Sequence, residues 1–325
     1  MNVRVVLITG AFGFVGSNLS RYLAGQGYTV WALDVPAQTA ASGHVYERVF
    51  NWGEMADIPW PQVDAVVHLA GKAHDTRNVS APESYFEVNV GLTHRILDAC
   101  VAVAPTRPPR AFILFSSVKA VADQVETMLD EQCAPNPQTP YGRSKLEAEH
   151  YVFKTLEKHT DSMCGYVLRP CMIHGPGNNG NLNMLYNVIR YGIPWPLGAY
   201  ENQRSFVSIR NVCAVIEGLL RGGVPSGIYQ VADDEPISTN VIIRLMADVM
   251  HRRIRIWRIP PRLIRAVAKV GDMFHLPLNS ERLRKLTESY VVSNVKIKEA
   301  LHWEKMPVSA VDGMCATLAS FTSPK

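Results

Sequence analysis

The residues best suited to chemistry include a phenol and an ammonium in the segment TPYGRSK (139–145). Tyr141 and Lys145 are four residues apart, so on a helix both side chains point to the same side. A phenol, with a pKa of about 10, becomes a base near neutral pH only if about 4 kcal/mol of preferential stabilisation favours the phenolate. A lysine ammonium and a second positive charge in a site with little water can provide this. Taken alone, however, the pair is more simply interpreted as two surface residues.

Ser117 strengthens the chemical interpretation. It follows the apolar run RAFILF (110–115), which predicts a buried strand, and it precedes Tyr141 by 24 residues. Side chains at the carboxyl end of a parallel strand face the ligand crevice. The Ser117 hydroxyl would then bind the same substrate oxygen that Tyr141 protonates or deprotonates.

A second motif comes directly after the first predicted strand. The segment TGAFGFVG (9–16) places Gly10, Gly13 and Gly16 between a strand and a helix, where a dinucleotide needs a tight turn and a close approach of its pyrophosphate to the backbone. The spacing is GxxGxxG, and the alternative is a purely structural turn. Asp34 ends the next strand, where a carboxylate accepts hydrogen bonds from ribose hydroxyls and repels a 2′-phosphate. These residues predict that the chain binds NAD rather than NADP.

The first half of the chain alternates β-branched runs with helical patterns. Unbroken apolar strands separated by helices predict a parallel sheet covered on both faces. We therefore expect an α/β protein with a Rossmann-type doubly wound sheet. The predicted strands are 3–8, 28–34, 45–52, 64–70, 110–117 and 164–170, and the predicted helices are 14–24, 82–101 and 140–157.

The composition and the pattern of predicted elements change after Pro170. Gly, Pro and Asn cluster in 174–181, and shorter elements come after them, including a helix over 237–250 with Ser238 as its N-cap. We expect an NAD-binding domain over 1–170 and a smaller mixed α/β domain over 171–325 that binds a nucleotide sugar. Segments such as 226–233 could return to the first sheet.

Composition excludes several classes of protein. The chain has 325 residues and a net charge of +4, and it has no apolar run near the ~20 residues of a membrane span. The start of the sequence lacks the pattern of a signal peptide. Six scattered cysteines without a CxxC predict neither a metal site nor a disulfide framework, and they suit a cytoplasmic protein. We expect no nucleic acid partner.

The positive charge is concentrated in one place. Residues 251–269 contain six Arg, one Lys and no acid, with Ile, Trp and Leu between them. The simpler interpretation is a solvated helix and a Pro-Pro turn. The other is weak contact with an anionic membrane surface.

The motifs taken together resemble the extended short-chain dehydrogenases/reductases that act on nucleotide sugars. The matching segments occur in the family's order over most of the chain. This resemblance implies that Ser117, Tyr141 and Lys145 are the catalytic triad and that Lys145 and Tyr141 also contact the cofactor. The matching segments are TGAFGFVG, HLAG (68–71), ESYFEVNVGLT (83–93), FSSVKAV (115–121), TPYGRSK, LRPCMIHGPG (168–177) and RSFVSIRNV (204–212). The cofactor-binding residues implied are Gly10, Phe12, Gly13, Phe14, Val15, Gly16, Asp34, Leu69, Ala70, Gly71 and Asn89.

The resemblance also implies where the nucleotide sugar binds. Family members hold the diphosphate near the segments that contain Asn181 and Arg204, and a second arginine often occurs later, for which Arg282 or Arg284 is the candidate. The alternative for Arg204 is a surface salt bridge. His174 departs from the family's usual Tyr or Phe, and we expect it to serve packing. Lys72 and His74 follow the fourth predicted strand, close to where a sugar ring would lie, and the equal alternative is that they are exposed loop residues. The substrate-binding candidates are Lys72, His74, Lys119, Asn181, Arg204 and Arg282.

The residues directly after Ser117 reduce the number of reactions that the enzyme could catalyse. Dehydratases of this family commonly continue with Asp-Glu, whereas this chain has Val118 and Lys119, so no carboxylate is placed for that proton transfer. We expect a C4 epimerase of a UDP-N-acetylhexosamine for bacterial surface polysaccharide, as a homodimer. One alternative is a reductase of a UDP-4-keto-6-deoxy-N-acetylhexosamine. The other is a non-catalytic NAD-binding sensor or scaffold, against which the intact Ser-Tyr-Lys set argues.

Overall fold

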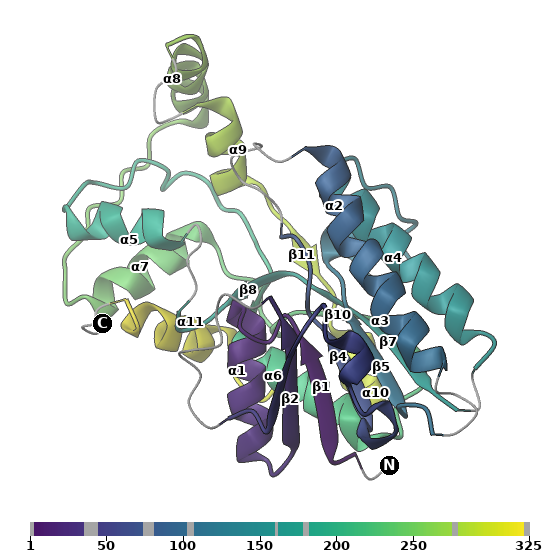
Figure 1. Cartoon of the computed structure of the whole chain (residues 1–325). Helices are drawn as coiled ribbons and strands as arrows, with labels where there is room; N and C mark the ends of the chain where they lie inside the picture. Colours follow the sequence, from purple (N-terminus) through teal and green to yellow (C-terminus); the bar gives the residue numbers. More distant parts are fainter. Residues whose placement is uncertain are drawn as a thin grey trace.

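A parallel sheet of seven strands forms the centre of the protein in a computed structural model (Figure 1). The structure describes residues 3–35, 45–73, 81–102, 107–159, 162–177, 182–274 and 279–321. Every pair of neighbouring strands in this sheet is parallel, which confirms the predicted Rossmann-type α/β fold. Across the sheet, the strands are β10 (Gly227–Val231), β7 (Cys164–Pro170), β5 (Ala111–Phe115), β4 (Ala65–His68), β1 (Val5–Thr9), β2 (Thr29–Asp34) and β3 (Arg48–Asn51).

Both faces of the sheet are buried. In β1, Val6 and Ile8 pack in one apolar cluster and Leu7 in another, because successive side chains of a strand point to opposite faces. The Val6 face is covered by α1 (Phe14–Gly25), α6 (Ile209–Arg221) and α10 (Val295–Leu301). The Leu7 face is covered by α3 (Gly91–Ala102) and α4 (Pro140–Leu156), and α2 (Pro82–Asn89) packs on α4. Two short helices, η2 (Met55–Asp57) and η3 (Trp60–Gln62), precede β4 in the sequence.

The single helix expected over 82–101 is two helices that meet at Val90. Val90 keeps helical dihedral angles, φ −87° and ψ −50°, so the direction of the chain changes little. The hydroxyl of Thr93 donates to the carbonyl oxygen of Asn89 at 2.6 Å. A threonine that bonds back to a carbonyl in this way competes with the regular ladder of the helix.

The C-terminal part has an apolar cluster of its own, separate from the two on the sheet. Ser238 caps α7 by accepting from the N–H of Val241, as predicted. No helix in the described segments is long and apolar enough to cross a membrane. The helices of this part are α5 (Leu182–Arg190), α7 (Thr239–Val249), α8 (Pro261–Met273), α9 (Ser280–Thr287) and α11 (Ala310–Ala319). Two small sheets also form. In one, β8 (Met172–His174) pairs with β9 (Phe206–Ser208); in the other, β6 (Met128–Leu129), from the first half of the chain, pairs with β11 (Val291–Val292).

The chain returns to the main sheet after residue 170. Strand β10 pairs in parallel with β7 along its whole length, from Gly227 beside Tyr166 to Val231 beside Pro170. Residues on both sides of the predicted boundary therefore share one sheet, and the division at residue 170 stays a prediction.

Candidate active site

Ser117 and Tyr141 meet beyond the carboxyl end of β5. Ser117 caps the short helix η4 (Val118–Ala120), and its oxygen accepts from the N–H of Lys119 at 3.2 Å. Tyr141 lies in the first turn of α4, whose start is set by the Thr139 hydroxyl accepting from the N–H of Gly142 at 3.2 Å. The Ser117 side chain lies near enough to the Tyr141 hydroxyl to lower the pKa of that phenol. Two segments that are far apart in the sequence thus place two hydroxyls side by side.

The surroundings of Tyr141 favour the neutral phenol. Burial raises the pKa of Tyr141, the Ser117 side chain lowers it in part, and Tyr85 raises it again. The Tyr85 ring lies edge-on to the Tyr141 ring, with 6.1 Å between centroids. Because the protein alone holds the proton on the phenol, a phenolate at this position needs a nearby positive charge.

Lys145 is the buried cation of the site. Its Nζ donates to the carbonyl oxygen of Phe115 at 2.9 Å, which ties α4 to the end of β5. Burial lowers the pKa of Lys145 to about 8, against the opposing effect of the Glu149 carboxylate. Most of the Lys145 side chains are therefore still protonated at neutral pH. A Cβ on Gly71 would lie 3.1 Å from this Nζ, so a glycine there leaves space beside the ammonium.

A buried ion pair lies beneath these groups, and no pattern in the sequence points to it. Arg169 of β7 donates through Nε to Glu149 of α4 at 3.0 and 3.1 Å, and both side chains are almost fully buried, at 2% and 1% exposure. Ser116, next to Ser117, donates its hydroxyl to the same carboxylate. The pair therefore fixes α4 and the end of β5 relative to each other.

The glycine motif forms a close turn between β1 and α1. Gly10 has φ +66°, and a Cβ there would lie 2.8 Å from the backbone nitrogen of Ala70. A Cβ on Gly16 would lie 2.2 Å from the carbonyl oxygen of Gly10. Gly13 caps α1 without a side chain, and the first turn contains no acidic residue. The N-terminus of α1 can therefore receive an anionic group, as a pyrophosphate site requires.

Asp34 lies at the end of β2, next to this turn. One carboxylate oxygen accepts from the N–H of Phe12 at 2.9 Å and the other from the N–H of Val35 at 2.8 Å. The negative charge is thus held beside the glycine turn, where a ribose would lie.

Replacing Asp34 by Ala is expected to weaken NAD binding by about 10- to 100-fold, because a hydrogen bond to a charged group contributes about 1.5–3 kcal/mol. It should also relieve the repulsion of the 2′-phosphate of NADP. Asp34→Asn is the matched control, since its carbonyl oxygen can still accept from Phe12 without the charge. Dissociation constants for both dinucleotides test this, and a wild-type protein that prefers NADP would contradict it.

A buried hydrogen-bond chain links the glycine turn to α3. His68 at the end of β4 has Nδ1 2.7 Å from the Thr9 hydroxyl and Nε2 3.0 Å from the Thr93 hydroxyl. Burial, with a smaller effect from the Lys145 charge, lowers the pKa of His68 to about 3, so the imidazole is neutral. The Thr9 hydroxyl also accepts from the N–H of Ala70 at 3.0 Å. His68 belongs to the HLAG segment, but the sequence alone assigns this histidine no role of its own.

Asn89 and Lys72 lie together at the other side of the site. The Asn89 amide donates to the Ser144 hydroxyl at 2.9 Å and accepts from the N–H of Lys72 at 2.8 Å. The Lys72 ammonium donates to the Ser84 hydroxyl of α2 at 2.9 Å. Asn89 therefore connects the segment after β4 to α4, as a buttressing residue would.

Two of the other substrate candidates lie near each other. Lys119 donates to the carbonyl oxygen of Asp123 at 2.8 Å and lies 4.5 Å from the centroid of the Tyr290 ring. Burial lowers the pKa of Lys119, the Asp123 and Glu288 carboxylates oppose this shift, and the charge of Arg204 adds to it. Arg204 donates to the carbonyl oxygen of Lys285 and lies 3.6 Å from the Glu288 carboxylate.

The remaining substrate candidates are not brought to this cluster by described contacts. Arg282 lies on the exposed first turn of α9, where its backbone N–H donates to Asn279 at 2.8 Å. His74 and Asn181 lie outside the described residues.

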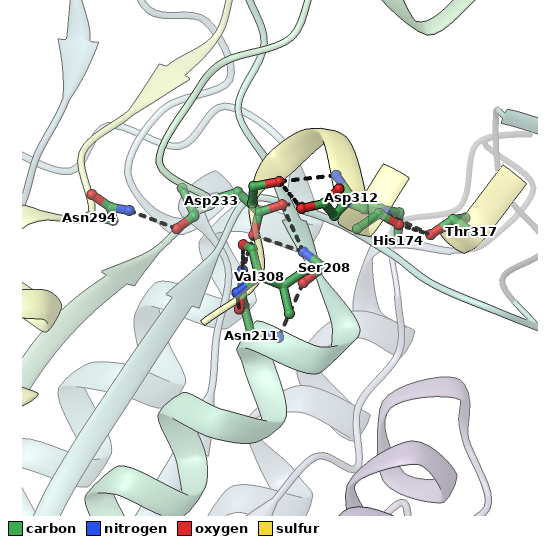
Figure 2. A network of polar contacts seen from close by, with 11 residues as sticks. His174, Ser208, Asn211, Asp233, Asn294, Val308, Asp312 and Thr317 are labelled. Carbon is green, nitrogen blue, oxygen red and sulfur yellow. Dashed lines mark hydrogen bonds and ion pairs between the residues drawn. The ribbon is translucent and has the colours of Figure 1, made fainter. Parts of the chain in front are cut away.

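His174 is part of a buried polar network in the C-terminal part (Figure 2). Its Nδ1 lies 2.8 Å from the Thr317 hydroxyl of α11, and its Nε2 lies 3.5 Å from the Asp233 carboxylate. Asp233 also accepts from the Ser208 N–H at 3.0 Å and from the Asn211 amide at 2.7 Å. The histidine is completely buried, so it joins β8 to α11 instead of facing a ligand.

Residues 6–232 match the NAD dependent epimerase/dehydratase family, which is more than half of the chain. The chain belongs to this family. It is therefore an NAD-dependent enzyme of the extended short-chain dehydrogenase/reductase type, as predicted. The residues described above fit the cofactor, because the turn at Gly10 and the open end of α1 accept a pyrophosphate and Asp34 accepts from a ribose.

Known members of the family resemble the chain over most of its length. UDP-glucose 4-epimerase of Vibrio cholerae is 29% identical over 97% of this chain and 95% of its own. GDP-6-deoxy-D-mannose reductase of Pseudomonas aeruginosa is 28% identical over 80% of this chain and 85% of its own. N-acetyl-alpha-D-glucosaminyl-diphospho-ditrans,octacis-undecaprenol 4-epimerase of Escherichia coli O157:H7 is 27% identical over 92% of this chain and 86% of its own.

The fold is shared with solved structures. The UDP-glucose 4-epimerase of Thermus thermophilus in complex with NAD superposes with a TM-score of 0.74 at 22% identity, over 98% of this chain and the whole of that chain.

Proposed function

We propose that this enzyme interconverts the two C4 epimers of a UDP-N-acetylhexosamine in the synthesis of a bacterial surface polysaccharide. The observation that carries the proposal is the placement of Ser117 at the cap of η4, after β5, beside Tyr141 in the first turn of α4, with Lys145 one turn further along the same helix. Val118 and Lys119 come next after Ser117, so no carboxylate stands where a dehydratase needs one. Similarity to 4-epimerases over nearly the whole chain supports the same reaction.

The proposed catalytic residues have distinct roles. NAD, when bound, supplies the group that takes a hydride from the sugar carbon and returns it. Tyr141 accepts the proton of the C4 hydroxyl and later gives it back, and Ser117 holds the same oxygen through a hydrogen bond. Lys145 would supply the positive charge that the phenolate form of Tyr141 needs, because burial disfavours that form. Lys119 and Arg204 supply positive charge for the diphosphate of the nucleotide.

A reductase of a 4-keto sugar nucleotide is the second candidate, favoured by the similarity to the Pseudomonas aeruginosa reductase. It would use the same three side chains. The two functions differ in the fate of the cofactor, because an epimerase returns the hydride to the sugar and a reductase consumes one reduced cofactor per product.

The purified enzyme is expected to interconvert UDP-GlcNAc and UDP-GalNAc without added cofactor, and to release bound NAD or NADH when it is denatured. Product is measured by chromatography, with and without NADH, and a UDP-4-keto sugar is the comparison substrate. Activity that depends strictly on stoichiometric NADH with only the keto sugar consumed would establish the reductase. Tight NAD binding with no turnover of any nucleotide sugar would favour the non-catalytic sensor.

A further inference from the structure

A strongly basic segment projects from the C-terminal part of the molecule. We call residues 251–274, which comprise α8 and the segment before it, the basic arm. Figure 1 shows α8 at the top of the molecule, beyond α9 and away from the main sheet. Within the described chain, α8 packs mainly on α9, so much of its surface faces solvent.

One face of α8 attaches it to the protein. Ile264, Ala268 and Gly271 are buried, and their spacing of four and three residues places them on one side of the helix. Asp272 joins the end of α8 to α9, since its carboxylate accepts from the N–H of Ser280 at 2.9 Å. The helix is therefore held in one orientation, and its other faces are defined.

A second face is apolar and exposed. Leu263, Val267, Val270 and Phe274 occur at spacings of four, three and four residues, so they form one stripe along the helix. Leu263 is 57% exposed and Phe274 is 64% exposed. Trp257, in the segment before the helix, is also exposed. Large apolar side chains gathered on one exposed face mark an interaction surface.

The third face carries positive charge. Arg262, Arg265 and Lys269 share the flank next to the apolar stripe, and all three are exposed. No salt bridge among the described residues involves any cation of the arm. The arm contains no acid before Asp272. The other cations of the arm, all exposed, are Arg252, Arg253, Arg255 and Arg258.

We propose that the basic arm binds the anionic surface of a lipid bilayer. The stripe from Leu263 to Phe274 would enter the headgroup region, and the flanking cations would lie against lipid phosphates. A nucleic acid would use the cations but not the apolar stripe. A second copy of the chain would bring two sets of seven like charges together, which opposes association. An anionic bilayer matches both features at once.

Binding is tested by co-sedimentation of the full chain with vesicles of phosphatidylglycerol and phosphatidylcholine, compared with vesicles of phosphatidylcholine alone. We expect binding to the anionic vesicles only. Arg262→Glu with Arg265→Glu and Lys269→Glu should lower the partition coefficient by about tenfold or more. Leu263→Ser with Val267→Ser and Val270→Ser should lower it by about tenfold as well. Raising NaCl from about 0.1 M to about 1 M, which shortens the Debye length from about 10 Å to about 3 Å, should release the wild type.

The matched control reverses three exposed cations elsewhere. Lys154→Glu with Lys158→Glu and Lys305→Glu changes the net charge equally and should leave vesicle binding unchanged. Retained NAD binding and an unchanged urea midpoint show that each variant is folded.

Absence of wild-type binding to anionic vesicles, or equal loss in the control, would overturn the proposal. The proposal would also fail if the wild type bound no vesicles but self-associated, and if only the serine variant lost that self-association. That result would assign the apolar stripe to contact with a second copy of the chain. The assay does not depend on turnover, so its result is separate from that of the proposed epimerase reaction.

Discussion

Tyr141→Phe is expected to lower the turnover number by about 10²- to 10⁴-fold, the usual range for losing an acid/base group. The substitution removes only the hydroxyl that lies beside Ser117. The ring keeps its edge-on contact with Tyr85, so the site should keep its shape. Binding of NAD should change little, because the glycine turn and Asp34 are untouched.

The measurement compares steady-state turnover, bound NAD and thermal unfolding of wild type and variant. Tyr151→Phe is the control, since it makes the same chemical change on the same helix, where Tyr151 bonds Asp98 on the surface. That variant should keep nearly full activity. If Tyr141→Phe retains more than about a tenth of wild-type activity, Tyr141 is not the acid/base.

Glu149→Leu is expected to lower the free energy of unfolding by about 3–5 kcal/mol, because removing one partner of a buried ion pair leaves the other charge without compensation. The Arg169 side chain is only 2% exposed and donates three hydrogen bonds to Glu149. Ser116 would lose its acceptor at the same time. The loss should therefore reach the catalytic end of β5.

Urea unfolding of a double-mutant cycle tests this expectation. Glu149→Leu with Arg169→Met should cost clearly less than the sum of the single changes, since no charge is left buried. Glu281→Ala removes one partner of the exposed Lys285–Glu281 pair of α9 and should cost only about 0.3–0.5 kcal/mol. A Glu149 variant as stable as this control would show that the buried pair does not hold the site together.

The sequence was sufficient for those parts of the fold that depend on local pattern. Apolar runs predicted the strands of the main sheet because both of its faces are buried. The glycine motif and the spacing from Tyr141 to Lys145 were predictable because each is a short continuous segment. The motif spans the turn from β1 to α1, and the spacing is about one helical turn of α4. The interruption at Val90 was missed because Val90 keeps helical dihedral angles, so the helical pattern of the sequence continues across it.

The contacts that support the site could not be predicted from local sequence patterns. Glu149 and Arg169 are 20 residues apart on a helix and a strand, and they meet because α4 packs against β7. His68 of β4 joins Thr9 of β1 to Thr93 of α3, so the three residues belong to three different elements. A buried polar group finds its partner through the tertiary arrangement, so spacing along the chain contains no signal for it.

The return of the chain to the sheet at β10 has a consequence for biosynthesis. A nascent chain grows from its N-terminus at about 5–20 residues per second. Until Gly227–Val231 leaves the ribosome, the edge of β7 has no partner, and unpaired strand edges invite pairing with other chains. The sheet is therefore completed only after residues 171–226, which follow β7 in the sequence, have been made. A fragment that stops at residue 170 would present that open edge permanently and should aggregate.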